Sequence, residues 1–102
     1  MTKACFYKVG NTFSGFEIEG HALVSLDTPD VLCAAVSGMT TLVLNTIIEV
    51  FSAELDFSED STIPRISAFL KTCPEENANA VNGVIQGFVL QLQDLQKQYP
   101  NN

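Results

Sequence analysis

His21 and Cys33 are the two residues whose types could act together, as a base and a nucleophile. They lie twelve positions apart in the stretch GHALVSLDTPDVLCAAVSG, residues 20–38, and His21 is the only histidine of the chain. Nucleophilic attack by cysteine needs a thiolate, whereas a free thiol with a pKa near ~8.5 is mostly protonated at neutral pH. A histidine within hydrogen-bond reach can take that proton and act as general base. The residue types alone leave a second interpretation open, in which Cys33 packs in the core and His21 lies on the surface.

The expected placement of the two residues favours the catalytic interpretation. The segment before His21 alternates apolar and acidic residues, as a strand does. Thr28, Pro29 and Asp30 then form a typical helix start. Cys33 is therefore expected in the first turn or so of that helix, where unpaired N–H groups and the positive end of the helix dipole stabilise a thiolate. The same N–H groups can stabilise the oxyanion formed during acyl transfer.

Two polar residues flank Cys33 at helical spacing. Asp30 precedes it by three positions, and its simplest role is to place negative charge at the helix N-terminus. Because a carboxylate beside a thiol opposes loss of the thiol proton, Asp30 is a candidate for positioning and not for activation. Ser37 follows Cys33 by four positions on the same helix face. Its hydroxyl can bond to the Cys33 carbonyl or face a substrate.

The cysteines do not have the spacing of a metal site or a disulfide framework. Cys5, Cys33 and Cys73 are widely spaced and odd in number, which predicts free thiols. Structural zinc sites usually contain two closely spaced cysteines, and the sequence has no glycine-rich phosphate loop, so we expect no metal and no cofactor. Cys5 is expected in the core. Cys73 is expected at the start of the second helix, without a second histidine to pair with it.

The hydrophobic pattern predicts four strands and two helices. The strands are expected over residues 3–9, 13–22, 55–60 and 62–70, and the helices over about residues 29–53 and from residue 72 onward. Thr72 and Glu75 have the spacing of a capping box. The order ββαββα has too few helices for a parallel sheet. It predicts one α+β domain over residues 1–102, with a mainly antiparallel four-stranded sheet packed against two helices.

Each predicted helix has an apolar stripe. The stripe of the first is Leu32, Ala35, Val36, Met39, Leu42, Val43, Ile47 and Val50, and that of the second is Val81, Val84, Ile85, Phe88, Leu92 and Leu95. Because the first helix is apolar more than halfway round, the sheet must cover one side of it and the other helix or a second subunit another side. We therefore expect a homodimer.

The charge of the chain limits its partners. Twelve Asp and Glu residues against five Lys and Arg residues give a formal net charge of -7. This charge repels nucleic acid and anionic membranes and favours a basic polypeptide as partner. Polar residues interrupt the longest apolar stretch, residues 32–51, so we expect no membrane span. The N-terminal residues lack the apolar run of a secretory signal, which predicts a cytoplasmic protein.

The combination of GHA at residues 20–22 and DVLCAAVS at residues 30–37 resembles the ribosomal-processing cysteine protease family called Prp. The resemblance implies a homodimeric α+β protease that removes the N-terminal extension of a large-subunit ribosomal protein precursor. It implies that Cys33 is the nucleophile and His21 the general base, and that Asp30 and Ser37 support substrate binding. It also implies cleavage after aromatic residues and a mobile loop between His21 and Cys33.

Two other functions remain as alternatives. One is a non-catalytic dimeric module that binds a basic ribosomal protein, with Cys33 as core packing. The other is a thiol redox sensor, although Cys33 and Cys73 have no resolving cysteine nearby in the sequence. The protease and the binding module differ in the effect of Cys33→Ala, which would abolish turnover in the first and alter stability modestly in the second.

Overall fold

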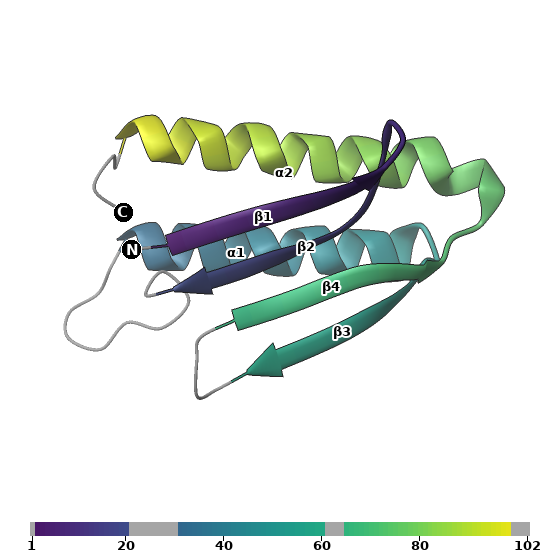
Figure 1. Cartoon of the computed structure of the whole chain (residues 1–102), viewed down its shortest axis with the longest axis horizontal. Helices are drawn as coiled ribbons and strands as arrows, with labels where there is room; N and C mark the ends of the chain where they lie inside the picture. Colours follow the sequence, from purple (N-terminus) through teal and green to yellow (C-terminus); the bar gives the residue numbers. More distant parts are fainter. Residues whose placement is uncertain (1, 21–30, 61–64, 99–102) are drawn as a thin grey trace.

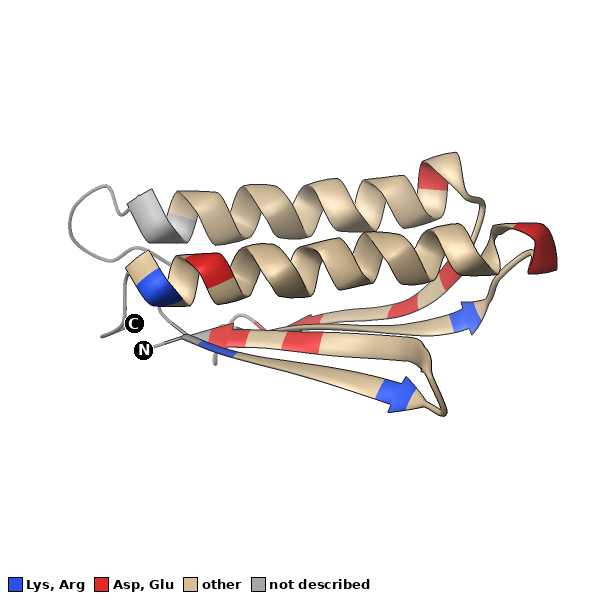
Figure 2. Ribbon diagram, turned by 90° about the horizontal axis from the view of Figure 1, so that it is seen from above, with Lys and Arg blue, Asp and Glu red and all other residues tan. Residues whose placement is uncertain are grey.

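The chain folds into a four-stranded antiparallel sheet covered on one face by two helices (Figures 1 and 2). The computed structural model describes residues 2–20, 31–60 and 65–98. Its elements are β1 (Thr2–Val9), β2 (Thr12–Gly20), α1 (Val31–Asn45), β3 (Glu54–Asp60), β4 (Arg65–Thr72) and α2 (Ala78–Gln98). A π-helical turn, Thr46–Val50, continues α1, and a 3₁₀ turn, Glu75–Asn77, precedes α2. The strand order is β1-β2-β4-β3, and the predicted α+β fold with the order ββαββα is confirmed.

The register of the sheet decides which side chains face the helices. Phe16 of β2 pairs with Phe6 of β1 on one side and with Ala68 of β4 on the other, and Ala68 pairs with Phe57 of β3. Directly paired residues point to the same face, and successive residues along a strand alternate between faces. This row and Ile18, two positions further along β2, therefore lie on the helix-covered face.

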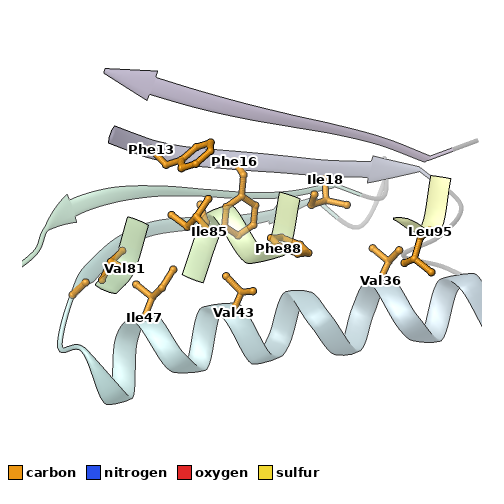
Figure 3. Close-up of a cluster of buried hydrophobic side chains, with 12 residues drawn as sticks. Phe13, Phe16, Ile18, Val36, Val43, Ile47, Val81, Ile85, Phe88 and Leu95 are labelled. Atoms are coloured by element: carbon orange, nitrogen blue, oxygen red, sulfur yellow. The ribbon is translucent and has the colours of Figure 1, made fainter. Parts of the chain in front are cut away.

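The core lies between this face and the two helices (Figure 3). Its buried residues are Phe13, Phe16, Ile18, Val36, Val43, Ile47, Ala53, Ala68, Val81, Ile85, Phe88 and Leu95. The ring of Phe88 on α2 contacts Phe16 and Phe6, at centroid distances of 5.3 and 5.7 Å. The predicted stripe of the second helix is confirmed, because four of its residues are buried and Val84 and Leu92 pack against them.

The first helix differs from its prediction at its C-terminal end and on one face. It is described from Val31, because the predicted start at Pro29 lies outside the described residues, and its π-helical continuation ends at Val50. Ser52 then adopts a φ of 57°, which leaves the right-handed helical region and ends the helix. Leu42 and Val50, both predicted on the buried stripe, are each 66% exposed. Within residues 34–50, the buried positions are Val36, Thr40, Val43 and Ile47. Successive residues of a helix are rotated by about 100° around its axis. The Leu42 side chain therefore points away from the stripe that these four buried residues form.

The capping box predicted for the second helix does not form. Thr72 is the last residue of β4 and pairs with Glu54 of β3, so it belongs to the sheet. The 3₁₀ turn that follows has no side-chain cap hydrogen bond, and α2 begins only at Ala78. The side chain of Asn77 instead donates to the Phe51 carbonyl at 2.9 Å. This bond ties the start of α2 to the segment that ends the first helix.

Where the structure describes them, the strand ends lie within two residues of the prediction, and β4 continues to Thr72 instead of residue 70. β2 is described up to Gly20 and β4 from Arg65 onward. Residues 21–22 and 61–64, including Pro64, lie outside the described residues. Neither helix within residues 31–60 and 65–98 is both long and apolar enough to cross a membrane.

On the open face of the sheet, two aromatic rings lie beside a glycine. Gly15 pairs with Tyr7 on one side and with Phe69 on the other, and the two ring centroids are 5.3 Å apart. The Tyr7 hydroxyl donates to the Glu17 carboxylate at 2.5 Å, and this bond is the main cause that raises the pKa of Tyr7 to about 12. The Phe69 ring approaches Gly15 so closely that the glycine is buried on an otherwise open face. A side chain at position 15 would therefore displace the aromatic contact.

We expect Gly15→Ala to destabilise the fold by about 1–3 kcal/mol, the usual cost of overpacking. The added Cβ would lie 2.5 Å from the Ala68 carbonyl oxygen and would also clash with the Phe69 ring, and the backbone oxygen cannot move aside. Urea unfolding followed by circular dichroism measures the change. Gly83→Ala on α2 is the control, because nothing lies within 4 Å of its added Cβ. Equal stabilities for the two variants would contradict this account of Gly15.

Candidate active site

The backbone of Cys33 lies in the first turn of α1. The helix begins at Val31, which makes Cys33 its third residue, and the predicted placement at a helix start is confirmed. The first N–H groups of a helix have no intrahelical acceptor and carry the positive end of the helix dipole. This end of the helix dipole favours an anion at position 33, such as a thiolate.

β2 leads to His21 at the same end of the molecule as the start of α1 (Figure 1). Its last residues are held to β4, where Glu19 pairs with Arg65 in the sheet register. The Arg65 Nε atom donates to a Glu19 carboxylate oxygen at 3.0 Å, and Nη2 forms a salt bridge with the same oxygen at 2.9 Å. Glu19 raises the pKa of Arg65. The pair is partly exposed, so its own contribution to stability is small. Its consequence is positional, because it joins the strand that precedes His21 to the neighbouring strand.

Buried side chains hold the start of α1 on the rest of the domain. Val36, three residues after Cys33, is 2% exposed, and Ile18, close to the end of β2, is fully buried. Both belong to the same core cluster as Leu95 of α2. Figure 3 shows Val36 and Leu95 pointing toward each other at this end of the core. One packed cluster therefore positions both the strand that precedes His21 and the helix that contains Cys33.

Ser37 is the flanking residue that the structure describes. It is half-buried on α1, four residues after Cys33, so the two share a helix face. The Ser37 carbonyl accepts a hydrogen bond from the Thr41 hydroxyl at 3.0 Å. His21 and Asp30 lie outside the described residues. The structure therefore brings together the chain segments that lead to the predicted site residues.

Cys5 is not a core residue, contrary to the prediction. It pairs with Glu17 and lies on the face opposite the helices, whereas the neighbouring Phe6 faces the core. The alternation of the strand was predicted, but which of its two faces packs under the helices depends on the register with β2. Cys5 is a free, half-buried thiol on the open face.

Cys73 also differs from its prediction. It lies between β4 and the 3₁₀ turn, and α2 begins five residues later at Ala78. Its Sγ donates to the Pro74 carbonyl at 3.5 Å, and it is a free thiol. Of the three cysteines, Cys33 is thus the one in the first turn of an α-helix. Among the described residues, no group of three or more His, Cys, Asp or Glu side chains could hold a metal ion.

The sequence matches the cysteine protease Prp family over residues 1–102, the whole chain. The chain belongs to this family. It is therefore a cysteine protease, and its four-stranded antiparallel sheet with two helices is the fold of a Prp protease. No curated protein matches the sequence.

Solved structures of Prp have a similar fold. The essential ribosomal processing protease Prp from S. aureus, in complex with a covalently linked product peptide, aligns with a TM-score of 0.83 at 19% identity, covering 100% of this chain and 94% of that chain. The same protease in complex with a substrate peptide aligns with a TM-score of 0.80 at 18% identity and the same coverage. A protein from Streptococcus mutans gives 0.80 at 18% identity over 99% of this chain and 91% of its own. At these identities the similarity concerns the fold.

The sequence did not indicate the Glu19–Arg65 pair that holds the strand before His21 in this Prp protease. The two residues are 46 positions apart and meet only through the register of β2 with β4. A conserved spacing or a local motif could not indicate such a pair, whereas a correct prediction of strand pairing could.

We expect Cys33 to be the most reactive thiol of this Prp protease at pH 6. A thiol whose pKa falls toward 6 should react about tenfold faster than an unperturbed one, because the gain in thiolate outweighs its lower intrinsic nucleophilicity. Iodoacetamide labelling of the folded protein, followed by peptide mass spectrometry, gives the rate for each cysteine. His21→Ala should remove the advantage of Cys33. Cys5 and Cys73 are internal controls, and equal rates at all three thiols would contradict an activated Cys33.

Proposed function

We propose that this protease removes the N-terminal extension of a large-subunit ribosomal protein precursor, with Cys33 as nucleophile and His21 as general base. The observation that carries the proposal is the position of Cys33 in the first turn of α1 in a chain that belongs to the Prp family. The structurally similar S. aureus Prp is a ribosomal processing protease that binds a substrate peptide and forms a covalent link to a product peptide. A covalent product is what a nucleophilic cysteine would leave.

In the proposed reaction His21 takes the thiol proton, and the Cys33 thiolate attacks the carbonyl carbon of the scissile bond. Backbone N–H groups in the first turn of α1 stabilise the oxyanion that forms. The C–N bond then breaks, and the imidazolium returns the proton to the leaving amine, which leaves a thioester on Cys33. Water, deprotonated by His21, attacks this thioester, and the acid product leaves as the thiol is restored. Each proton taken by His21 is thus returned within the cycle.

The flanking residues are proposed to bind the substrate. Ser37 follows Cys33 by one helical turn, which places it beside the nucleophile on α1. Asp30 directly precedes the first residue of α1. An acidic side chain at this point suits binding and positioning of a polypeptide better than thiol activation, because its charge opposes thiolate formation.

The charge of the protein supports a basic substrate. The formal net charge is -7, and ribosomal proteins are basic, so long-range attraction raises the rate of encounter. We place the reaction in the cytoplasm, where ribosome assembly would supply the precursor. We treat residues 1–102 as one catalytic domain, because both helices and all strands share one core.

We also propose that the protease is a homodimer that associates through its helix layer. The fifteen residues of α1 include no charged side chain, and in α2 charges occur only near the C-terminus, at Asp94 and Lys97. Figure 2 shows that most of the helix layer carries neither sign of charge. On this layer Leu42 is 66% and Leu90 is 54% exposed. Exposed apolar side chains on an uncharged surface are typical of the centre of an interface between subunits.

We expect Cys33→Ala to abolish processing and to leave the fold intact. Mass spectrometry of the precursor ribosomal protein after incubation should show one N-terminal cut with wild type and with Cys73→Ala. The cut should be lost in Cys33→Ala, with a decrease in kcat of at least about 10³-fold, as expected for removal of a nucleophile. Cleavage retained in Cys33→Ala would contradict the assignment of the nucleophile. No cleavage by any folded variant would favour the binding module instead.

We expect Leu42→Glu to weaken the dimer about tenfold or more, because it introduces a charge at the centre of the interface. Sedimentation equilibrium should give twice the chain mass of 11.1 kDa for wild type and a concentration-dependent shift to the monomer for the variant. Val9→Glu, at a 75% exposed position of β1, is the matched control. A monomeric wild type, or equal dissociation of the two variants, would argue against this interface.

A further inference from the structure

β3 has one side without a partner in the described residues. It is seven residues long, lies at the edge of the sheet and pairs only with β4. An edge strand presents a row of unpaired N–H and C=O groups that can pair with another extended chain. Apart from the half-buried Leu55, all side chains of β3 are exposed. Neither helix therefore covers this edge.

The side chains of β3 combine acidic groups with an exposed aromatic ring. Four of its seven residues are acidic and none is basic. Within the described residues, Glu54, Asp56 and Glu59 have no salt bridge and no side-chain hydrogen bond. Phe57 is 49% exposed although it lies on the helix-covered face of the sheet. The edge therefore offers backbone hydrogen bonds, negative charge and an apolar contact together.

A second copy of the chain does not fit this edge. Two β3 strands side by side would bring four acidic residues against four, and like charges opposite each other destabilise strand pairs. Charge on an edge strand often prevents pairing between copies. Here the charge is of one sign, so it excludes another copy and favours a basic extended chain.

The outer edge of β3 also ends on the same side of the sheet as the candidate active site. β2 and β3 both run antiparallel to β4, so they run in the same direction, and the ends of all three strands align at Glu19, Arg65 and Asp60. β3 thus ends at the same end of the sheet at which β2 leads to His21 (Figure 1). A chain that added antiparallel to β3 would begin near this end and run away from it.

The distance between β2 and a strand added outside β3 suits a polypeptide that is cut near its N-terminus. A strand added outside β3 would lie three strand spacings from β2, about 14 Å. About four or five extended residues span that distance. The chain that follows the scissile bond could therefore leave the active site and join β3 after a short connection. Antiparallel addition gives the correct chain direction for this path.

We propose that the outer edge of β3 binds an extended, lysine- or arginine-rich segment of the substrate, C-terminal to the scissile bond, as an antiparallel fifth strand of the sheet. This rests on the proposed function, because it takes the substrate to be a basic protein from which an N-terminal extension is removed. Since paired residues point to the same face, basic side chains belong opposite Asp56 and an apolar side chain opposite Phe57. The main chain supplies affinity, and these side chains supply specificity.

The first experiment measures binding without cleavage. The probe is the fluorescent peptide Lys-Val-Lys-Val-Lys-Val-Lys, and the protein is the Cys33→Ala variant. Removal of two acidic charges by Asp56→Asn with Glu59→Gln should weaken binding about fivefold at low salt. Glu75→Gln with Glu76→Gln removes the same charge from the 3₁₀ turn and should change affinity less than about twofold. Equal losses in the two double variants would overturn the proposal.

Amide hydrogen exchange separates strand addition from general attraction of charge. On addition of the peptide, amides of β3 should gain protection, while those of the other edge strand, β1, should not. A pattern with the same protection at both edges, or none at β3, would contradict the pairing. This measurement does not depend on protease activity, so it tests the edge even if the proposed substrate is wrong.

A third experiment measures whether the edge of β3 contributes to cleavage of the precursor. The β3 double variant should lower kcat/KM about fivefold for the full precursor and leave it unchanged for a short peptide that ends at the residue after the cut. Equal values for wild type and variant on the precursor would refute a role of the edge in processing. If wild type cleaves neither substrate, the proposed function fails, whereas the binding and exchange results still decide whether β3 accepts a basic strand.

Discussion

The position of the candidate site depends on the burial of one face of β2 under the two helices. Phe16 and Ile18 are 1% and 0% exposed, while Glu17 and Glu19 alternate with them on the open face. A slip of one residue would exchange these faces and bring two carboxylates into the core. Each fully buried side chain of this kind contributes about 1.5–3 kcal/mol, a large part of the net stability of a small domain. The register that stabilises the fold is thus the register that sets where β2 delivers the chain to His21.

Charged residues are distributed unequally between the helix layer and the sheet. α1 has no charged residue, whereas β3 has four, and the Glu19–Arg65 pair lies on the open face of the sheet. Burial does not explain the neutrality of the helices, because Leu42 and Leu90 are exposed. An uncharged layer suits contact between copies, and the acidic edge strand β3 suits the proposed basic substrate. With the two layers separate, a dimer formed through the helices would leave the sheet edges accessible.

The sequence predicted the order of elements and the core better than it predicted the ends of elements. Periodicity identified Val81, Ile85, Phe88 and Leu95 correctly, because a helix that packs on a sheet buries one stripe. It could not indicate that Thr72 is used by the sheet, since that depends on pairing with Glu54. The same limit applies to Cys5, whose face follows from the pairing of β1 with β2.

For the candidate site, the local sequence was sufficient to predict the start of the helix that contains Cys33. A helix start near residue 30 follows from the residue types of residues 28–30, and Cys33 lies in the first turn as a consequence. Asn77, which donates to the Phe51 carbonyl, has no local signature, because its acceptor lies 26 residues away in the chain. Nor does the Arg65 contact with Glu19. These contacts position the elements, and they become visible only when the chain is folded.

The two edge strands of the sheet, β1 and β3, differ in charge and in regularity. β1 carries Lys3 and Lys8 and no acidic residue, and a bulge between Tyr7 and Lys8 interrupts its register. The Lys8 ammonium lies 4.6 Å from the centre of the Phe13 ring, so positive charge is held against the sheet at this edge. Bulges and lysines are the usual means by which an edge strand avoids pairing. A basic chain would thus be repelled at β1 and attracted at β3, and opposite charge at the two edges of the sheet would orient the proposed basic substrate before it contacts the proposed catalytic residues.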